Sequence, residues 1–222
     1  MIINRHSTSV TPIHKSYARQ MGNLWASCGK SKTKHAKTLT EQDIERVLTY
    51  IEPRQHASRN RALLMITYYS GMRVGEVAGL RYKDIVDVDR NIRAEILLLP
   101  ENTNGAAKRT VFISEKLRLE LTHYLNVTEF RDPHDKFFYT QKKNSEGFTP
   151  NTLAQHFHYL YRRSGVVGAT GHSGRRSFIR NLASKGVSVH VLADLAGHKS
   201  VATTRQYINK NEDVQRQAVE LI

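Results

Sequence analysis

A nearly unbroken apolar run between residues 58 and 71 constrains the fold more than any other segment. It begins near Ser58, continues through Ala62-Leu-Leu-Met-Ile-Thr-Tyr-Tyr and stops at Gly71. A helix that is apolar on nearly every side has to be covered by other elements, so this run predicts a helix at the centre of the domain. Gly71 is expected to end the helix, because glycine adopts the left-handed conformation of a helix C-terminus at low cost.

Helices and one short pair of strands are predicted around this central helix. Thr40 is a candidate N-cap for a helix from Glu41 to Ile51, and Pro53 ends it. The sequence further predicts strands at 92–99 and 109–113, joined by the turn signal Glu101-Asn-Thr-Asn-Gly105 as a β-hairpin. Further helices are expected at 72–80, 114–126, 150–163, 171–185, 188–196, 200–207 and 211–221. The predicted fold class is therefore α+β, mostly α, with a small β-hairpin.

Positive charge dominates the chain and is unevenly distributed. The 222 residues include 34 Lys and Arg against 20 Asp and Glu, which gives a net charge of +14 and favours a polyanionic partner, nucleic acid first. Every acidic residue lies at or after Glu41. Residues 1–39 are therefore interpreted as a basic N-terminal arm, and residues 40–222 as the folded domain.

Apolar residues recur at helical spacing within the arm, at Ile13, Tyr17, Met21, Leu24 and Cys28. This pattern predicts a helix that either packs on the domain or also touches DNA. Cys28 is the single cysteine, which excludes a disulfide framework and a cysteine-based zinc site. We find neither a bilayer-spanning apolar run nor a signal-peptide core, so we expect a cytoplasmic, nucleoid-associated protein with no membrane partner.

Residues suited to phosphate chemistry gather toward the C-terminus. His172-Ser-Gly-Arg175 is followed by Leu195-Ala-Gly-His198 and then by Tyr207, with Asp194 as the only acidic residue among them. Guanidinium groups bind phosphate oxygens in bidentate fashion, and a phenol can act as a nucleophile. The combination indicates a phosphate-handling site that contains a tyrosine.

Two segments resemble the conserved boxes of a known family. Ser70-Gly-Met-Arg73-Val-Gly-Glu76-Val-Ala-Gly-Leu80 resembles the first arginine box of the tyrosine recombinases, also called the phage integrase family. The second box is similar to His172-x-x-Arg175 together with the Leu-Ala-Gly-His198 element and Tyr207. The resemblance spans most of the chain, from residue 40 onward, and in size the chain resembles the short fimbrial-switch type of invertase.

The resemblance implies a helical catalytic domain that cuts and rejoins double-stranded DNA through a 3′-phosphotyrosyl intermediate, with no cofactor and no metal ion. It also implies a homotetramer holding two DNA sites, with accessory DNA-bending proteins as further partners. The nature of the recombination event, whether integration, excision, inversion or resolution, is not defined by the sequence.

The chemistry of the individual residues suits these roles. Attack by the Tyr207 phenol on phosphorus conserves the energy of the broken bond in a covalent link. Arg73 and Arg175 are suited to clamp the non-bridging oxygens, where charge builds up. We expect His172 to accept or relay the tyrosine proton and His198 to donate a hydrogen bond to the phosphate.

Three positions carry further expectations. Relatives usually have a lysine in the hairpin turn that protonates the departing 5′ oxygen, whereas this chain has Asn104 there and Lys108 a few residues later. Either Lys108 reaches the leaving group or acid catalysis is weakened. Gly174 stands where the family often has leucine, which is expected to loosen the local packing. Glu76 is expected to hold Arg73 in place and not to react.

Other interpretations are open at this point. Each candidate site residue also has a structural interpretation, as a packing residue, a helix cap or part of a solvated basic face. A DNA-binding regulator that kept the fold without turnover is compatible with Asn104. A metal nuclease built on His156 and His158 lacks a convergent carboxylate cluster. A type IB topoisomerase shares the chemistry but works as a monomer. The apolar face predicted for residues 211–222 would argue against it if it docks on a neighbouring subunit, and self-packing of this helix is the alternative.

Overall fold

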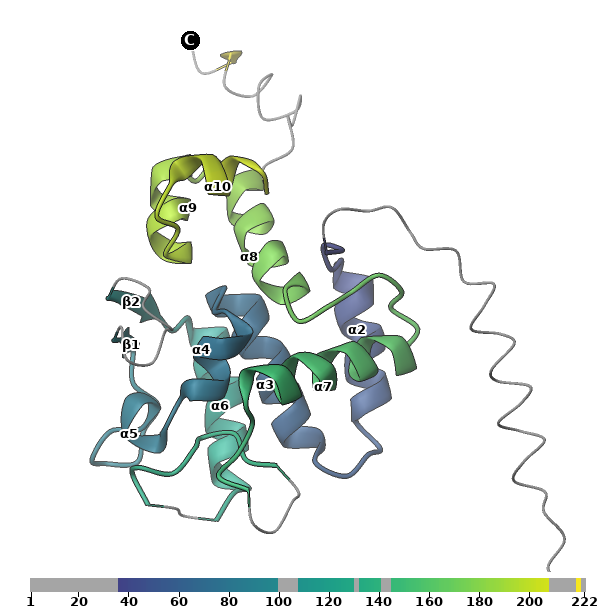
Figure 1. Ribbon diagram of the computed structural model, residues 1–222, viewed down its shortest axis with the longest axis vertical. Coiled ribbons are helices and arrows are strands. Elements are labelled where there is room, and N and C mark those ends of the chain that lie inside the picture. Colours follow the sequence, from purple (N-terminus) through teal and green to yellow (C-terminus); the bar gives the residue numbers. More distant parts are fainter. Residues whose placement is uncertain (1–35, 100–107, 130–131, 141–144, 208–218, 221–222) are drawn as a thin grey trace, which may run out of the picture. The chain divides into compact units, whose positions relative to one another are not determined.

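The computed structural model describes residues 36–99, 108–129, 132–140, 145–207 and 219–220 (Figure 1). Its helices are α2 (Glu41–Ile51), α3 (Ala57–Ser70), α4 (Val74–Gly79), α5 (Tyr82–Ile85), α6 (Glu115–Asn126), α7 (Pro150–Arg163), α8 (Ser173–Ser184), α9 (Val189–Ala196) and α10 (Val201–Arg205). Strands β1 (Glu95–Leu98) and β2 (Arg109–Phe112) form a two-stranded antiparallel sheet. The predicted class, mostly helix with one small antiparallel pair, is confirmed. No helix in these ranges is long and apolar enough to cross a membrane.

Helix α3 lies at the centre of the domain, as its apolar run predicts. Leu63, Leu64 and Ile66 are completely buried, and α3 packs against α6 on one side and α8 on another. Its last turn ends at Gly71, which has φ 65° and leads the chain directly into the segment before α4. The predicted C-terminal glycine is therefore confirmed.

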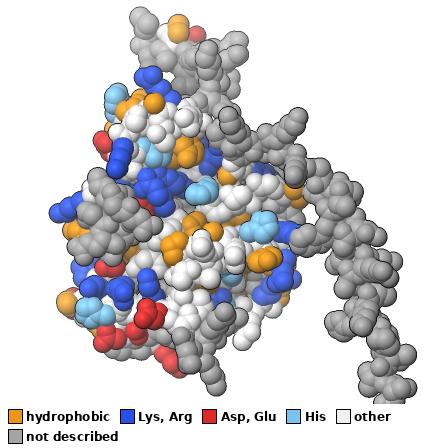
Figure 2. Space-filling model, viewed as in Figure 1, with side chains coloured by type: hydrophobic (Ala, Val, Ile, Leu, Met, Phe, Trp, Pro, Cys, Tyr) orange, Lys and Arg blue, Asp and Glu red, His pale blue; other side chains and the backbone are white. Residues whose placement is uncertain are grey.

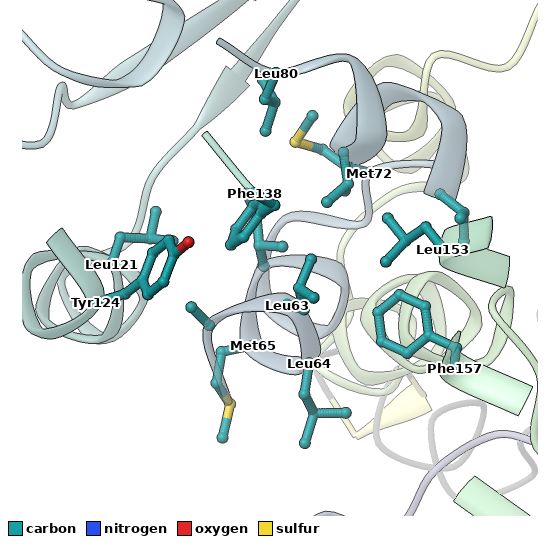
Figure 3. Close-up of a cluster of buried hydrophobic side chains, with 14 of the residues drawn as sticks. Leu63, Leu64, Met65, Met72, Leu80, Leu121, Tyr124, Phe138, Leu153 and Phe157 are labelled. Atoms are coloured by element: carbon teal, nitrogen blue, oxygen red, sulfur yellow. The ribbon is translucent and has the colours of Figure 1, made fainter. Parts of the chain in front are cut away.

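In the hydrophobic core, side chains from several elements pack near α3 (Figure 3). Leu121 and Tyr124 approach from α6, Leu153 and Phe157 from α7, and Phe138 from the segment between these two helices. Figure 3 also shows Met72 and Leu80, which flank α4, in the same core. Met72, Val74, Val77 and Leu80 are all buried. Helix α4 is thereby fixed on its apolar side.

The element boundaries agree with the sequence expectations in some places and differ in others. Thr40 caps α2 as predicted, and its hydroxyl accepts a hydrogen bond from Asp43 N at 3.1 Å. Helix α4 begins two residues later than expected, so Arg73 occupies its N-cap position. Helix α10 is shorter than expected and leaves Tyr207 beyond its end. The sequence patterns gave no indication of α5.

Three expectations concern residues outside the described ranges. They are the helix in the N-terminal arm, the turn that contains Asn104, and the helix expected at 211–221 except for residues 219–220.

Gly174 allows close packing, and the expected loosening is wrong. Helix α8 approaches α3 so closely that a Cβ at Gly174 would lie 2.4 Å from Thr67 Oγ1 and 2.8 Å from Thr67 Cβ. Thr67 is buried and donates its hydroxyl to the Leu64 carbonyl at 2.9 Å, so it cannot turn aside without losing that bond. A leucine has no room here, and the close contact places Arg175 directly beside the end of α3.

The replacement Gly174→Ala should lower the free energy of unfolding by about 1–3 kcal/mol, because the added methyl group overpacks the contact between α8 and α3. Gly75→Ala is the matched control, since a Cβ there would meet Pro150 at an ordinary 3.8 Å. Urea denaturation of both variants measures the difference. A Gly174→Ala protein as stable as the wild type would contradict the close approach.

Candidate active site

Three arginines converge on the C-terminal end of α9. The carbonyls of residues 195–197 each accept a hydrogen bond from a different one: the first from Arg109 Nη1 at 2.8 Å, the second from Arg175 Nη2 at 2.6 Å and the third from Arg73 Nη2 at 2.7 Å. The last carbonyls of a helix have no partner within the helix and carry its negative partial charge. The helix end therefore holds three guanidinium groups close together.

A buried carboxylate joins two of these arginines. The side chain of Glu76 is only 2% exposed, and its Oε1 accepts a hydrogen bond from Arg73 Nη1 at 2.8 Å. Its Oε2 accepts from Arg109 Nη2 at 2.6 Å and from the Arg73 backbone N at 2.7 Å. The expectation that Glu76 holds Arg73 agrees with these contacts.

Arg175 lies in the interior and is not part of a solvated surface. The residue is 4% exposed, and its second amino group, Nη1, donates to the Gly71 carbonyl at 2.7 Å. Its guanidinium thus spans the ends of two helices, α3 and α9. Burial, together with the charges of Arg73 and Arg109, lowers the pKa of Arg175 to about 10, while Glu76 acts in the opposite direction. Arg175 is therefore still a cation at neutral pH.

His198 follows the arginine-bound carbonyls and is held as a neutral ring. Burial, together with the charges of Arg175, Arg73 and Arg109, lowers its pKa to about 4. Its Nδ1 lies 2.8 Å from the hydroxyl of Thr204, a completely buried residue. With Nδ1 occupied by Thr204, Nε2 is the ring nitrogen left to face a phosphate.

Tyr207 lies beside this histidine. The two rings stack with centroids 5.5 Å apart and an interplanar angle of 21°. The guanidinium of Arg176 also lies over the Tyr207 ring, with Cζ 5.5 Å from the ring centroid. The tyrosine is half-buried and follows the last turn of α10, where its backbone N donates to the Thr204 carbonyl at 2.9 Å.

Four of the six candidate residues, Arg73, Arg175, His198 and Tyr207, thus form one cluster. The other two lie on exposed segments. His172 is the N-cap residue of α8, where its side chain makes no capping hydrogen bond, so the capping interpretation finds no support. Lys108 is exposed and directly precedes β2. No hydrogen bond connects either side chain to the cluster among the described residues.

The sequence patterns did not single out Arg109. It pairs with Leu98 across the sheet, and Leu98 is buried. Residues directly opposite each other in an antiparallel pair point to the same face, so alternation from the buried Val111 back to Arg109 would have indicated an inward-facing arginine. This signal was overlooked because charged residues usually occupy solvated positions.

The surroundings of the predicted metal-nuclease histidines do not support that alternative. Within the described ranges, no three His, Cys, Asp or Glu side chains are grouped so as to hold a metal ion. His156 instead lies against Phe148, with ring centroids 5.3 Å apart, and burial lowers its pKa to about 4. His158 is exposed next to Tyr159.

The surface charge agrees with a site for a polyanion. In Figure 2 the Lys and Arg side chains gather in the region between α9 and α4, with histidines among them. Most of the acidic side chains visible on this face lie at its lower end, away from that region.

Comparisons with known proteins agree with the motifs. The phage integrase family model matches residues 37–213. The tyrosine recombinase XerA of Pyrococcus furiosus is 28% identical over 184 residues, which cover 83% of this chain and 61% of that protein. Transposase A of transposon Tn554 from Staphylococcus aureus is also 28% identical over 184 residues, covering 78% of this chain and 48% of the transposase. The chain thus spans about half to three fifths of the length of these relatives.

Solved structures show the same fold. The crystal structure of the XerA recombinase superposes with a TM-score of 0.66 at 23% identity, over 84% of this chain and 65% of that one. The Tn1549 transposon integrase, in complex with transposon right end DNA, gives a TM-score of 0.66 at 19% identity, over 87% of this chain and 68% of that one. At these identities the likeness concerns the fold alone.

The lowered pKa of His198 predicts a specific acid sensitivity. Between the ordinary value of 6.5 and about 4 the unfolded chain binds a proton that the folded protein does not, so His198 should reduce stability as the pH falls through this window. Urea denaturation at pH 7 and pH 5 should show a larger loss for the wild type than for His198→Gln. His158→Gln, at an exposed position, serves as the control and should behave like the wild type. Equal losses in all three proteins would contradict a neutral, charge-surrounded His198.

Proposed function

The chain belongs to the phage integrase family, and on that premise we propose that it is a site-specific recombinase that cleaves and rejoins DNA through a 3′-phosphotyrosyl intermediate. The observation that carries the proposal is the cluster at the end of α9. There two guanidinium groups, a neutral imidazole and a phenol are gathered in one cluster.

In the proposed reaction the phenolic oxygen of Tyr207 attacks the scissile phosphorus. A bond forms between this oxygen and phosphorus, the bond from phosphorus to the 5′ oxygen breaks, and the 5′ oxygen leaves as a hydroxyl group. The link formed is a 3′-phosphotyrosine. Attack by the 5′ hydroxyl of another strand reverses these steps and reseals the DNA.

Charge on the non-bridging oxygens is neutralised by groups that are already in place. Arg73 and Arg175 are fixed by carbonyls of α3 and α9 and by Glu76, so little reorganisation is needed when charge develops. His198 is neutral at working pH and donates from Nε2, while Thr204 holds the other ring nitrogen. No metal ion is needed for this neutralisation in the proposal.

Proton transfer is assigned to the two exposed candidates. His172 accepts or relays the proton of the tyrosine, and Lys108 supplies a proton to the departing 5′ oxygen. The exposure of both residues is compatible with contact to a DNA strand laid over the site.

The proposal extends to the assembly. Residues 40–222 act as the catalytic domain, residues 1–39 as a basic DNA-contacting arm, and four copies hold two duplexes with the help of accessory DNA-bending proteins. The proposed setting is the cytoplasmic nucleoid. The net charge of +14 and the DNA in the structure of the Tn1549 integrase support DNA as the partner in this assembly.

One observation favours a second function. Asn104 occupies the position where relatives usually have the acid lysine, which is compatible with a DNA-binding regulator that has lost turnover. The two functions differ in a single property, the formation of a covalent bond to DNA.

Incubation with a radiolabelled nicked duplex that traps the cleaved strand should yield an adduct that resists denaturation. Tyr207→Phe should abolish the adduct, because phenylalanine has no nucleophilic oxygen, whereas Tyr159→Phe, at a tyrosine on the exposed face of α7, should retain it. Excess EDTA should leave the yield unchanged. Specific binding with no adduct in the wild type would identify the regulator, and loss of cleavage in EDTA would indicate a metal nuclease.

Binding to duplex DNA should depend steeply on salt, because each phosphate contact releases counterions. If six phosphates are contacted, the affinity should fall about a thousandfold between roughly 50 and 200 mM salt. Fluorescence anisotropy with a labelled duplex measures the slope. A flat response would contradict an extended DNA interface.

A further inference from the structure

We propose that Arg109 is a positioning residue that connects strand β2 to the phosphate-binding groups, setting both the orientation of Arg73 and the place of His198. This inference rests on the proposed recombinase function. It assigns a role to a buried arginine that lies outside the two sequence boxes.

The first connection runs through Glu76. Arg109 Nη2 donates to Glu76 Oε2 at 2.6 Å, and the same carboxylate accepts from Arg73 Nη1 and from the Arg73 backbone. Arg73 contacts both carboxylate oxygens, and Arg109 adds a further hydrogen bond to Oε2 from a different element, strand β2. Arg109 therefore reinforces the orientation of the carboxylate that holds Arg73 and ties it to β2.

The second connection runs through the end of α9. Arg109 Nη1 donates to the Leu195 carbonyl at 2.8 Å. Its side chain also lies flat against Gly197, where a Cβ would be 2.4 Å from Arg109 Cδ and 2.6 Å from its Nε. Gly197 has φ 63° and directly precedes His198, so the arginine packs on the residue that turns the chain into the histidine.

Arg109 is more deeply buried than Arg73, and it donates to a carboxylate, whereas the described hydrogen bonds of the buried Arg175 go to backbone carbonyls. The side chain of Arg109 is 8% exposed, against 35% for that of Arg73. Its charge is offset inside the protein, by Glu76 and by the negative end of α9. Arg109 is therefore placed to act on Arg73 and His198, and its role differs from that of a third phosphate ligand.

The position of Arg109 in the chain makes the placement of the phosphate-binding groups depend on β2. Arg109 is the first residue of β2 and directly follows Lys108, the candidate acid, and β2 packs against α9. A movement of β2 away from α9 would release the Leu195 carbonyl and one side of Glu76 together. Correct placement of the phosphate-binding groups therefore requires β2 to be packed against α9.

The test compares Arg109→Lys and Arg109→Met with Arg118→Lys and Arg118→Met. Arg118 also forms an ion pair with a glutamate, Glu115, at 2.6 Å, but on the exposed face of α6. Arg109→Lys retains the charge and loses only the planar fork, which keeps the test valid if Arg109→Met does not fold. Single-turnover cleavage of the nicked duplex, DNA affinity and thermal unfolding are measured for each protein.

Arg109→Lys should slow cleavage about ten- to a hundredfold at unchanged DNA affinity, the range expected when a supporting residue behind a reactive group is lost. The defect should persist on a duplex with sulfur at the bridging 5′ position, a leaving group that needs no proton. The Arg118 variants should match the wild type. Cleavage at the wild-type rate would overturn the inference, as would full recovery on the sulfur substrate, because recovery would mean that Arg109 acts only through leaving-group protonation.

A measurement on the free protein separates this inference from the proposed function. The ring resonances of His198, assigned with His198→Gln, should shift in Arg109→Lys and stay in place in Arg118→Lys. If the wild type forms no adduct, the recombinase proposal fails, while a shifted His198 signal still supports the placement of His198 by Arg109. Unshifted His198 resonances in Arg109→Lys would overturn it whatever the activity.

Discussion

The hydrogen bonds between three arginines and the C-terminal carbonyls of α9 are the interactions on which the candidate site depends. Cations gathered this closely repel one another, and burial removes the water that would solvate them. The structure offsets both costs with groups that carry negative charge, namely the helix end, the carbonyl of Gly71 and the carboxylate of Glu76. Because α3, α4, α8, α9 and β2 each contribute a part, the site depends on the packing of all five elements.

This arrangement also determines what the site can do. Guanidinium groups fixed in advance stabilise charge that appears during a reaction without having to reorient, which is the main source of electrostatic catalysis. Burial and the field of these arginines lower the pKa of His198 and keep it neutral, so that it serves as a hydrogen-bond donor and does not add a further cation. Tyr207 stacks on that ring, half-exposed, next to the groups that would neutralise its target. Buried support and an accessible nucleophile are thus combined within one cluster.

Local patterns in the sequence predicted much of this fold. The apolar run of α3, the glycine that ends it and the Thr40 cap depend on neighbouring residues alone, and all three are as expected. Gly174 and Arg109 were misjudged or missed, because their importance comes from contacts with Thr67 on α3 and with α9, which are distant in sequence. Four site residues from the two boxes lie together, whereas the roles of His172 and Lys108 depend on a DNA strand and stay predictions.

The central claim is that Arg73 and Arg175 bind the phosphate while Arg109 stays bound to the protein. A crystal structure with a nicked duplex and vanadate in place of the scissile phosphate tests it directly. The account predicts a bond from vanadium to the oxygen of Tyr207, with Arg73, Arg175 and His198 donating to the vanadate oxygens and Arg109 still on Glu76 and the Leu195 carbonyl. Vanadate bound away from Tyr207, or held by Arg109 with Arg73 turned aside, would contradict it.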